Sequence, residues 1–481
     1  MFDVLKDVFK VIKSNAQNSD NQLIGRQIAN SPQIEGLISD LVDEVMVFNH
    51  ALQAVSDPIE NCVAQAQKKI QQTGALRGRP LYHNYLGTGA GRGPFVELED
   101  GSVKMDLING IGIHIMGHGH PRVIKAAIRG SISDIVMQGN LQPNNEYLKL
   151  SEKLVQIAGR KSKLKYAWFA TCGTMANESA LKMARQKNST PQGSPRMIMA
   201  MKNAFAGRST LMAEVTDNAA YKQGLPDYNE VLRIPNYDKK DPQSAEKALR
   251  AMKDHVEKYP NQISCFVFEP MLGEGGFNPV PREFYVPMLE FCKQQKIAVW
   301  ADEVQTFMRT GEFFAFETMD LGQYVDIVTV AKTLQLAATL YTEEYNPKPG
   351  LIAGTFSGST PAMTAGLEIL NMMEEGFIGP NGRIHQIYKR FVDGFNHLST
   401  TTCKGLITDP GGMGLMIAFT PFDGKKEQVE TLVKKLFNNG IIAFSCGKDP
   451  VRIRLLVPAV IMDQEIDLAL EIIGRTLQEG I

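Results

Sequence analysis

The chain has 481 residues, 43% of them hydrophobic, and its 51 basic residues nearly balance its 52 acidic ones. This length allows a large buried core and suggests two or three domain-sized units. Because the balanced charge creates no overall field that would draw the protein to nucleic acid or to an anionic membrane, we expect small molecules as its partners.

Cysteine usage and hydropathy indicate the compartment. The six cysteines are scattered without the close spacing of a disulfide framework or a zinc site, which is typical of reduced thiols. No apolar run approaches the roughly 20 residues of a membrane-spanning helix. Asp3, Lys6 and Asp7 interrupt the first apolar residues, unlike a signal or transit peptide. We therefore expect a cytoplasmic protein.

The first 75 residues are predicted to be a helical extension. Ile34, Leu37, Ile38, Leu41 and Val42 recur at the spacing that places apolar side chains on one face of a helix. We favour a packing or oligomer-forming role for this extension, and the alternative is an amphipathic helix on a membrane surface.

After the extension, a hairpin is predicted over residues 93–107, with its turn at Asp100 and Gly101. Short apolar runs then alternate with helical stretches, and these runs occupy residues 166–170, 197–201, 265–268, 297–301 and 327–331. This alternation predicts an α/β fold in which helices cover both faces of a mostly parallel sheet.

The C-terminal part follows a different order, which predicts a smaller α+β domain. Strands are expected at residues 413–419, 441–445 and 451–456, and helices at 425–438 and 466–478. We expect this domain to share its sheet with the N-terminal hairpin. The predicted units are therefore the extension (1–75), the small domain (76–130 and 371–481) and the large domain (131–370).

Ionisable residues follow three of the predicted parallel strands. Glu269, Asp302 and Lys332 each stand at or just beyond the end of an apolar run. Because ligands bind beyond the carboxyl ends of the strands in open α/β sheets, we expect these side chains along one edge. A structural ion pair is the simplest alternative for such a carboxylate and lysine.

Further residues favour a cofactor site. Phe205 could cover the face of a ring, and Gly173 and Thr174 precede a clear helix at residues 175–185, whose start would bind an anion. Pyridoxal phosphate needs an amine, an anion beside its ring nitrogen, a surface for its ring and donors for its phosphate. Lys332 would supply the amine that forms a Schiff base, and Asp302 the anion.

In their order along the chain, the motifs resemble those of the class III aminotransferases, which are pyridoxal-phosphate enzymes of fold type I. The resemblance covers roughly residues 85–478, and the motifs are Gly117-His118-Gly119-His120-Pro121, Cys172-Gly173-Thr174-Met175-Ala176-Asn177-Glu178, Phe205-Ala206-Gly207-Arg208, Glu269-Pro270 with Gly273-Glu274-Gly275-Gly276, and Asp302-Glu303-Val304-Gln305-Thr306.

This resemblance implies roles for further residues. Gln305 would bond the ring oxygen of the cofactor, and Thr355 would reach the phosphate bound in the neighbouring subunit of a homodimer. Arg208 resembles the arginine that holds a distal carboxylate, and Arg454 the arginine that grips the α-carboxylate of glutamate or 2-oxoglutarate. Glu274 resembles the carboxylate that pairs with this second arginine when the donor has no carboxylate there.

The resemblance also implies an activity, the transfer of an amino group from an ω-amino acid to 2-oxoglutarate by a ping-pong mechanism. The segment 340–355 is similar to 4-aminobutyrate and lysine ε-aminotransferases. Ile111 stands where these enzymes carry isoleucine and ornithine aminotransferases carry tyrosine, but acetylornithine enzymes share the isoleucine. The alternatives are acetylornithine or ornithine aminotransferase, a pyridoxal-phosphate aminomutase, and a family member without enzymatic activity.

The chain departs from the family pattern at several positions. The usual glycine-rich stretch after the lysine is replaced by residues 333–338, Ala206 stands where histidine is common, and the segment 302–311 is one residue short. Met175 replaces a cysteine of the animal 4-aminobutyrate enzymes, so we expect no iron–sulfur cluster.

Two other patterns support no site. His114, His118 and His120 are crowded but have no acidic or cysteine ligand beside them in the sequence, so we expect no metal. Residues 87–93 are glycine-rich, but Arg92 and the following hairpin argue against a dinucleotide loop.

Overall fold

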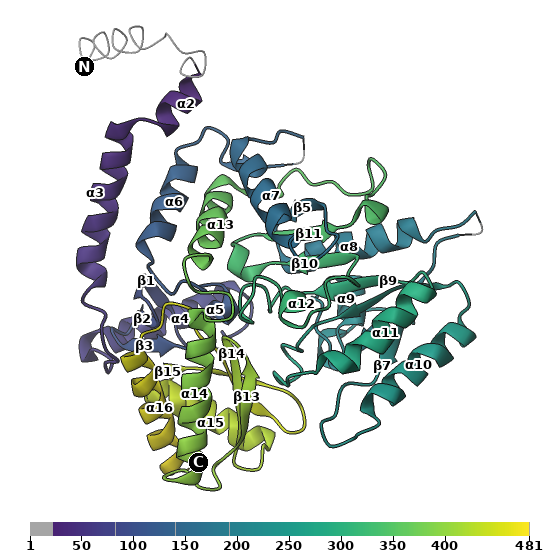
Figure 1. Cartoon of the computed structure of the whole chain (residues 1–481). Helices are drawn as coiled ribbons and strands as arrows, with labels where there is room; N and C mark the ends of the chain where they lie inside the picture. The colour runs from purple at the N-terminus through teal and green to yellow at the C-terminus, as the bar shows by residue number, and fades with distance from the viewer. Residues whose placement is uncertain (1–22, 82, 140, 192, 481) are drawn as a thin grey trace.

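The computed structural model describes residues 23–81, 83–139, 141–191 and 193–480. Within these residues, a seven-stranded sheet forms the centre of the molecule and two four-stranded sheets lie beside it (Figure 1), while one further sheet has only two strands. The order of the central strands is β5 (Tyr166–Ala170), β11 (Ala337–Tyr341), β10 (Ile327–Val330), β9 (Ala298–Asp302), β8 (Ile263–Phe268), β6 (Met197–Met201) and β7 (Val231–Ile234).

The central sheet is mostly parallel, which confirms the predicted fold class. Strands β10, β9, β8, β6 and β7 pair in parallel, whereas β11 is antiparallel to both of its neighbours, β10 and β5. The strands β8, β9 and β10, which carry the three ionisable ends, are therefore adjacent and run in the same direction.

Helices cover both faces of this sheet (Figure 1). Alternate side chains of a strand point to opposite faces. Ile198 and Ala200 pack with α8 (Gly173–Lys187) and α9 (Thr210–Val215), whereas Met197 and Met199 belong to the larger core. Buried residues of three further helices also belong to that larger core, namely α7 (Asn145–Ala158), α10 (Ser244–Lys258) and α11 (Arg282–Gln294).

One of the two four-stranded sheets joins N-terminal and C-terminal segments, and the other is built from C-terminal segments alone. One contains β1 (Gly87–Arg92), β2 (Phe95–Leu98), β3 (Val103–Asp106) and β15 (Ile441–Ile442), and the other contains β13 (Ile407–Met413), β14 (Met416–Pro421), β17 (Arg452–Leu456) and β16 (Phe444–Cys446). The parallel pair of β3 and β15 confirms that the hairpin shares its sheet with the C-terminal part. Three helices pack against these two sheets, namely α14 (Arg383–Thr400), α15 (Lys426–Asn438) and α16 (Asp463–Gln478).

The small sheets differ from the prediction. The single strand expected at residues 441–445 is two short strands, β15 and β16, because the chain passes from one sheet to the other at the buried Ala443. The glycine-rich residues 87–92 form β1 at the edge of the first small sheet.

The N-terminal extension is helical in its described part and lies along one side of the molecule (Figure 1). It comprises α2 (Ile24–Ala29), α3 (Pro32–Asn49) and α4 (Glu60–Leu76). Helix α3 packs against α6 (Pro121–Ser131) and buries Ile38 and Val42, while Leu37 and Leu41 stay exposed. Among the described helices, none is long and apolar enough to cross a membrane.

The remaining elements, most of them short, connect these layers. They are α5 (Asn109–Gly112), β4 (Met137–Gln138), η2 (Ala219–Tyr221), α12 (Ala315–Thr318), η3 (Lys332–Leu334), η4 (Glu343–Tyr345), β12 (Gly358–Ser359) and α13 (Thr360–Met373). Helix α13 contacts α6, α7 and η3, and so supports the turn that carries Lys332.

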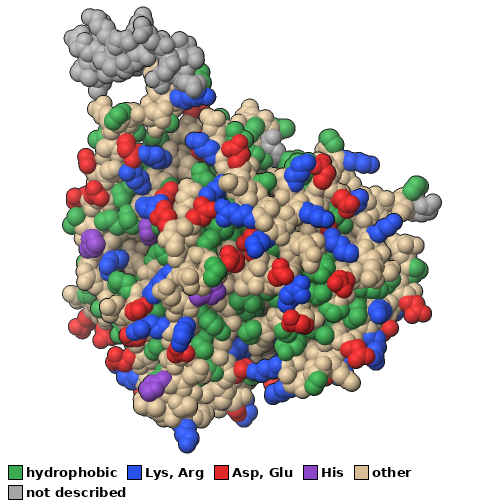
Figure 2. Space-filling view, in the orientation of Figure 1, with side chains coloured by type: hydrophobic (Ala, Val, Ile, Leu, Met, Phe, Trp, Pro, Cys, Tyr) green, Lys and Arg blue, Asp and Glu red, His purple; other side chains and the backbone are tan. Residues whose placement is uncertain are grey.

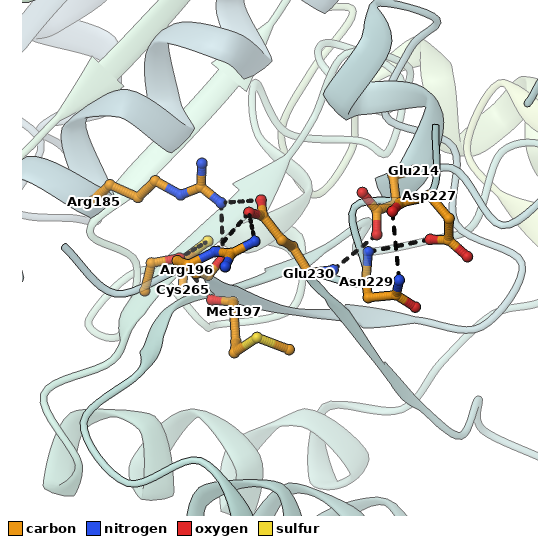
Figure 3. Close-up of polar contacts among 9 residues, drawn as sticks. Arg185, Arg196, Met197, Glu214, Asp227, Asn229, Glu230 and Cys265 are labelled. Carbon is orange, nitrogen blue, oxygen red and sulfur yellow. Dashed lines mark hydrogen bonds and ion pairs between the residues drawn. The ribbon is translucent and has the colours of Figure 1, made fainter. Parts of the chain in front are cut away.

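Helix α8 is fixed at the end remote from the candidate site by an ion-pair cluster (Figure 3). The carboxylate of Glu230 lies 2.7 Å from Nη2 of Arg185 and 3.0 Å from Nη2 of Arg196, and the Glu230 amide donates to Glu214. Arg185 lies in the last turn of the helix, where a cation is favoured by the helix dipole. The cluster ties the C-terminal end of α8 to the amino ends of β6 and β7.

Candidate active site

Asp302 and Lys332 stand on neighbouring strands of the central sheet. Strand β9 ends at Asp302, which pairs with Thr329 of the parallel strand β10, and Lys332 follows that strand by two residues. The structure therefore brings these two predicted residues together at the carboxyl edge of the sheet.

Asp302 is buried and fully engaged. Its Oδ2 accepts from Nδ2 of Asn177 at 2.7 Å, and its Oδ1 accepts from the Val304 amide at 3.0 Å. Burial raises the pKa of Asp302 to about 6, although both hydrogen bonds and the nearby Lys332 favour the charged form. A cation placed beside Asp302 would have a fixed counter-ion there.

Lys332 lies in a strained turn, with φ of 53°, and its side chain is half-buried. Its Nζ donates to the carbonyl oxygen of Ile111 at 3.3 Å. Burial, together with the cations Arg309 and Arg454, lowers the pKa of Lys332 to about 8, against the opposing effects of Glu274 and Asp302. A lysine with this pKa is a nucleophile near neutral pH.

Glu269 and Phe205 are joined by a hydrogen bond at the next strand end. The Phe205 amide donates to Oε1 of Glu269 at 2.9 Å, and the Gly273 amide donates to Oε2 at 2.9 Å. Burial and the neighbouring Asp302 raise the pKa of Glu269 to about 8. Glu269 thus fixes the loop that carries Phe205.

Gly173 and Thr174 form the first turn of α8, where backbone N–H groups are free to bind an anion. A Cβ atom at Gly173 would lie 2.8 Å from Cγ1 of Val304, so glycine allows a close approach to the segment after Asp302. The Thr174 side chain lies against Gly207, whose φ of 122° suits glycine.

Gln305 lies beside Gly273, close to the loop that Glu269 holds. Its Oε1 is buried and has no hydrogen-bond partner among the described residues. An unpaired buried amide is costly, so a polar atom of a ligand at this position would be stabilised.

The two predicted substrate arginines differ in burial. Arg454 is buried, and its Nη1 lies 2.7 Å from Oε1 of Glu274. Arg208 is exposed, and the centre of its guanidinium lies 3.8 Å from the centroid of the Tyr221 ring. A guanidinium stacked in this way keeps its N–H edges available for a carboxylate.

Ile111 and Thr355 lie at the periphery of the site. Ile111 is 41% exposed and has a φ of 61° within a left-handed turn. Thr355 is exposed, and the segment that carries it lies against Gly139. In the single chain, the carbonyl oxygen of Ile111 thus contacts the Lys332 amine, whereas the Thr355 side chain is exposed to solvent.

Four further polar or aromatic residues lie at the site, and no pattern in the sequence pointed to their roles. Asn177 bonds Asp302, Tyr221 stacks on Arg208 and contacts Phe205 edge-on, and Arg309 and Gln335 donate to carbonyl oxygens of the 109–113 turn. Asn177 stands within one of the family motifs, and this position was the one feature of the sequence that could have indicated its role.

The histidine cluster has an acidic neighbour in the fold. Nε2 of His118 lies 3.0 Å from Oδ2 of Asp106, so the expectation that no carboxylate stands beside these histidines holds for the sequence but not in space. The described residues contain no group of three or more ligands placed to hold a metal ion.

The site offers complementary groups for pyridoxal phosphate. Lys332 presents an amine of lowered pKa, Asp302 a buried carboxylate, and Gln305 a side-chain amide whose N–H groups can donate to an oxygen. Gly173 and Thr174 present the N–H groups of a helix start. These donors and acceptors match the ring nitrogen, ring oxygen, phosphate and carbonyl carbon of this cofactor.

Comparisons with known proteins agree with this chemistry. The family model for class III aminotransferases matches residues 82–477. A probable 4-aminobutyrate aminotransferase from Bacillus subtilis is 30% identical over 402 residues, which cover 79% of this chain and 90% of the relative. An acetylornithine aminotransferase from Methanocaldococcus jannaschii is 29% identical over 398 residues, covering 81% and 92% of the two chains.

The fold also matches solved structures. A lysine aminotransferase from M. tuberculosis superposes with a TM-score of 0.75 at 21% identity, and the match covers 85% of this chain and 99% of the other. Because the family model spans most of the chain and the fold agrees, this protein belongs to the class III aminotransferases, enzymes that use pyridoxal phosphate to pass an amino group from an amino donor to a keto acid.

Proposed function

We propose that this enzyme transfers the amino group of an ω-amino acid, such as 4-aminobutyrate or lysine, to 2-oxoglutarate. The observation that carries the proposal is the ion pair of Arg454 and Glu274, whose Nη1 and Oε1 atoms lie 2.7 Å apart. The Arg454 side chain is only 5% exposed, whereas that of Glu274 is 35% exposed. Glu274 can therefore move away and leave Arg454 to bind the α-carboxylate of a 2-oxo acid.

Arg208 supports the choice of donor. It is exposed, stacked on Tyr221, and has no carboxylate partner among the described residues, so it is free to bind the distal carboxylate of a donor such as 4-aminobutyrate. During the donor half-reaction, Glu274 would stay paired with Arg454, because an ω-amino donor has no carboxylate at that position.

The roles of the central residues follow from their positions. When bound, pyridoxal phosphate supplies a carbonyl that joins the donor amine and a ring that accepts electrons from the neighbouring carbon. Asp302 would hold a proton on the ring nitrogen through its buried carboxylate. Lys332 Nζ would carry a proton between the substrate carbon and the cofactor carbon, and Gln305 would bond the ring oxygen.

A homodimer is part of the proposal. Thr355 is exposed in the single chain, and the N-terminal turn of α8 is only partly covered. Resemblance to the family suggests that Thr355 binds the phosphate held by the partner subunit, so that each site would use residues of both chains.

A donor screen tests this function. The enzyme loaded with coenzyme is mixed with each donor alone, and the change in visible absorbance is followed, with 2-oxoglutarate then added to restore the starting spectrum. We expect 4-aminobutyrate or lysine to give the highest kcat/KM, and turnover to require the 2-oxo acid.

A second candidate, acetylornithine aminotransferase, is favoured by the relative from Methanocaldococcus jannaschii. A kcat/KM for N-acetylornithine more than about ten-fold above that for the other donors would replace our proposal, since one methylene is worth only about 1–3 kcal/mol in such a pocket. Turnover of a single amino acid without any 2-oxo acid would instead identify an aminomutase.

A further inference from the structure

The turn of residues 109–112 has an unusual backbone. Its four residues all have positive φ, with values of 53°, 62°, 61° and 79°. A β-branched residue such as Ile111 avoids this region, and such conformations persist only where the surroundings enforce them. The turn must therefore be held by its neighbours, and it carries the Ile111 side chain that borders the site.

Asp106 holds the N–H side of this turn. Its Oδ1 accepts from the amides of Ile108 and Asn109 at 3.0 and 2.7 Å, and its Oδ2 accepts from the amide of Gly110 at 3.1 Å. His118 contacts the same carboxylate at 3.0 Å. One buried side chain thus fixes the entry to the turn.

Three consecutive carbonyl oxygens on the other side are bonded by three different side chains. Lys332 donates to Ile111 at 3.3 Å, and Gln335 donates to Ile113 at 3.2 Å. Arg309 donates to the carbonyl oxygen of Gly112, which lies between them. The Arg309 side chain is buried, and its Nη1 also donates to the carbonyl oxygen of Gln305 at 2.8 Å.

Gln335 is an unexpected residue at its position. Its φ is 69°, in the region where glycine sits without strain, and it closes the short turn that begins at Lys332. A glycine there would relieve the backbone but could not reach Ile113. The side-chain amide therefore offsets a local backbone cost by linking two turns that are 222 residues apart.

We propose that Gln335, together with Arg309, is a positioning residue that locks the 109–113 turn against the Lys332 turn. The lock keeps the Ile111 side chain as a fixed wall of the donor pocket and keeps the Ile111 carbonyl within reach of the Lys332 amine when that amine is free. This inference deepens the proposed function, because it concerns how the same site holds its donor.

The variant Gln335→Gly separates positioning from folding. Because glycine suits a φ of 69°, we expect the melting temperature to stay equal or rise. In the full chain without coenzyme, backbone amides of residues 108–113 should exchange with deuterium at least about ten-fold faster, measured by mass spectrometry of peptides. In the loaded enzyme, KM for the preferred donor should rise roughly five-fold, with kcat less affected.

Two further variants make the test decisive. Lys296→Gly relieves a similar φ of 57° at an exposed position, and it should leave both exchange at 108–113 and donor KM unchanged. Gln335→Glu keeps the size of the side chain but removes the N–H donor, so it should behave like Gln335→Gly.

The proposal is overturned if exchange of residues 108–113 is the same in Gln335→Gly as in the unchanged protein, or if Gln335→Glu retains normal exchange. The exchange measurement needs no substrate. If the wild-type enzyme turned over none of the tested donors, the proposed function would fail while the lock remained independently testable.

Discussion

At the scale of single residues, burial sets the protonation of both central groups. The pKa of Lys332 is lowered to about 8, and that of Asp302 is raised to about 6. Between pH 6 and pH 8, Asp302 is mostly charged, and the neutral fraction of Lys332 increases with pH. The neutral form of Lys332 is needed to attack a carbonyl carbon, and the charged form of Asp302 is needed to hold a proton on the ring nitrogen.

This protonation predicts the pH dependence of coenzyme capture. Only the neutral amine attacks, so the rate at which unloaded enzyme binds pyridoxal phosphate should rise about ten-fold per pH unit below pH 8 and level off above it. Stopped-flow absorbance measures this rate. A rate of capture that still rises steeply at pH 10 would show that Lys332 has an ordinary pKa. The variant Lys332→Ala should show no covalent capture of the coenzyme and almost no transamination.

Tyr221 is expected to determine affinity for carboxylate-bearing donors. Its ring lies 3.8 Å from the Arg208 guanidinium, and a cation–π contact of this kind contributes about 0.5–2 kcal/mol. Tyr221→Leu should therefore raise KM for 4-aminobutyrate by roughly three- to ten-fold, while Tyr221→Phe should stay near wild type. Steady-state kinetics with a simple monoamine, which lacks the carboxylate, provide the control, and an equal loss with both donors would contradict this role.

Part of the site could be predicted from the sequence because its residues follow apolar strands or stand in local motifs. Asp302, Lys332 and Glu269 close buried runs, and parallel strands bring such ends to one edge. Tyr221 and Gln335 could not be predicted, because the sequence does not show which residue of another loop each side chain contacts. A short polar loop in the sequence does not reveal which carbonyl its amide will meet.

At the scale of elements, the start of α8 depends on close packing. Strand β9 and the segment after it approach the first turn of the helix, where a Cβ at Gly173 would lie 2.8 Å from Val304. The Glu230 cluster fixes the other end of the helix, so α8 cannot slide to relieve a clash. The anion-binding turn is therefore held at one position relative to Asp302.

Gly173→Ala should weaken phosphate binding. The added methyl group must displace Val304 or the helix start, and overpacking of this kind costs about 1–3 kcal/mol. We expect roughly ten-fold faster loss of coenzyme on dialysis, measured by residual absorbance. The matched control is Gly36→Ala in α3, where no atom of the described residues lies within 4 Å of the new atom, and it should raise stability slightly without changing coenzyme retention.

Five of the seven central strands could be predicted, but β7 and β11 could not. The runs that form β5, β6, β8, β9 and β10 are apolar and separated by helical stretches, which is the signal of a parallel sheet. Strand β11 directly follows the lysine turn and contains Ala337, Ala338 and Thr339, which have no distinctive period. It is a buried strand only because it inserts between β10 and β5, and this insertion is a tertiary effect.

At the scale of the whole molecule, charged side chains of both signs are interspersed over the surface shown in Figure 2. The exposed apolar side chains of α3 differ from this pattern, since Leu37 and Leu41 are 64% and 53% exposed.

The division of the chain into an extension, a small domain and a large domain stays a prediction, as does the homodimer.

Mixed dimers can test whether Thr355 acts on the partner's site. Lys332→Ala and Thr355→Glu should each be nearly inactive alone, the first without its amine and the second with a carboxylate facing a phosphate. If Thr355 acts across subunits, unfolding and refolding the two variants together should restore about a quarter of wild-type activity, because half of the dimers would contain one intact site. Recovery of no activity, with dimers verified by light scattering, would place Thr355 in its own subunit's site, whereas normal activity of Thr355→Glu alone would place Thr355 outside any site.

The attachment of α3 to the body of the protein combines two kinds of contact. Glu35 forms ion pairs with Lys125 and Arg129 of α6, and Ile38 and Val42 are buried beneath the helix. Salt screens exposed ion pairs but strengthens apolar burial only when the anion is strongly hydrated. A protease that cleaves near Gly36 should therefore act faster in sodium chloride and slower in sodium sulfate. Detachment of α3 from α6 would then depend on which ions are in solution and not on ionic strength alone.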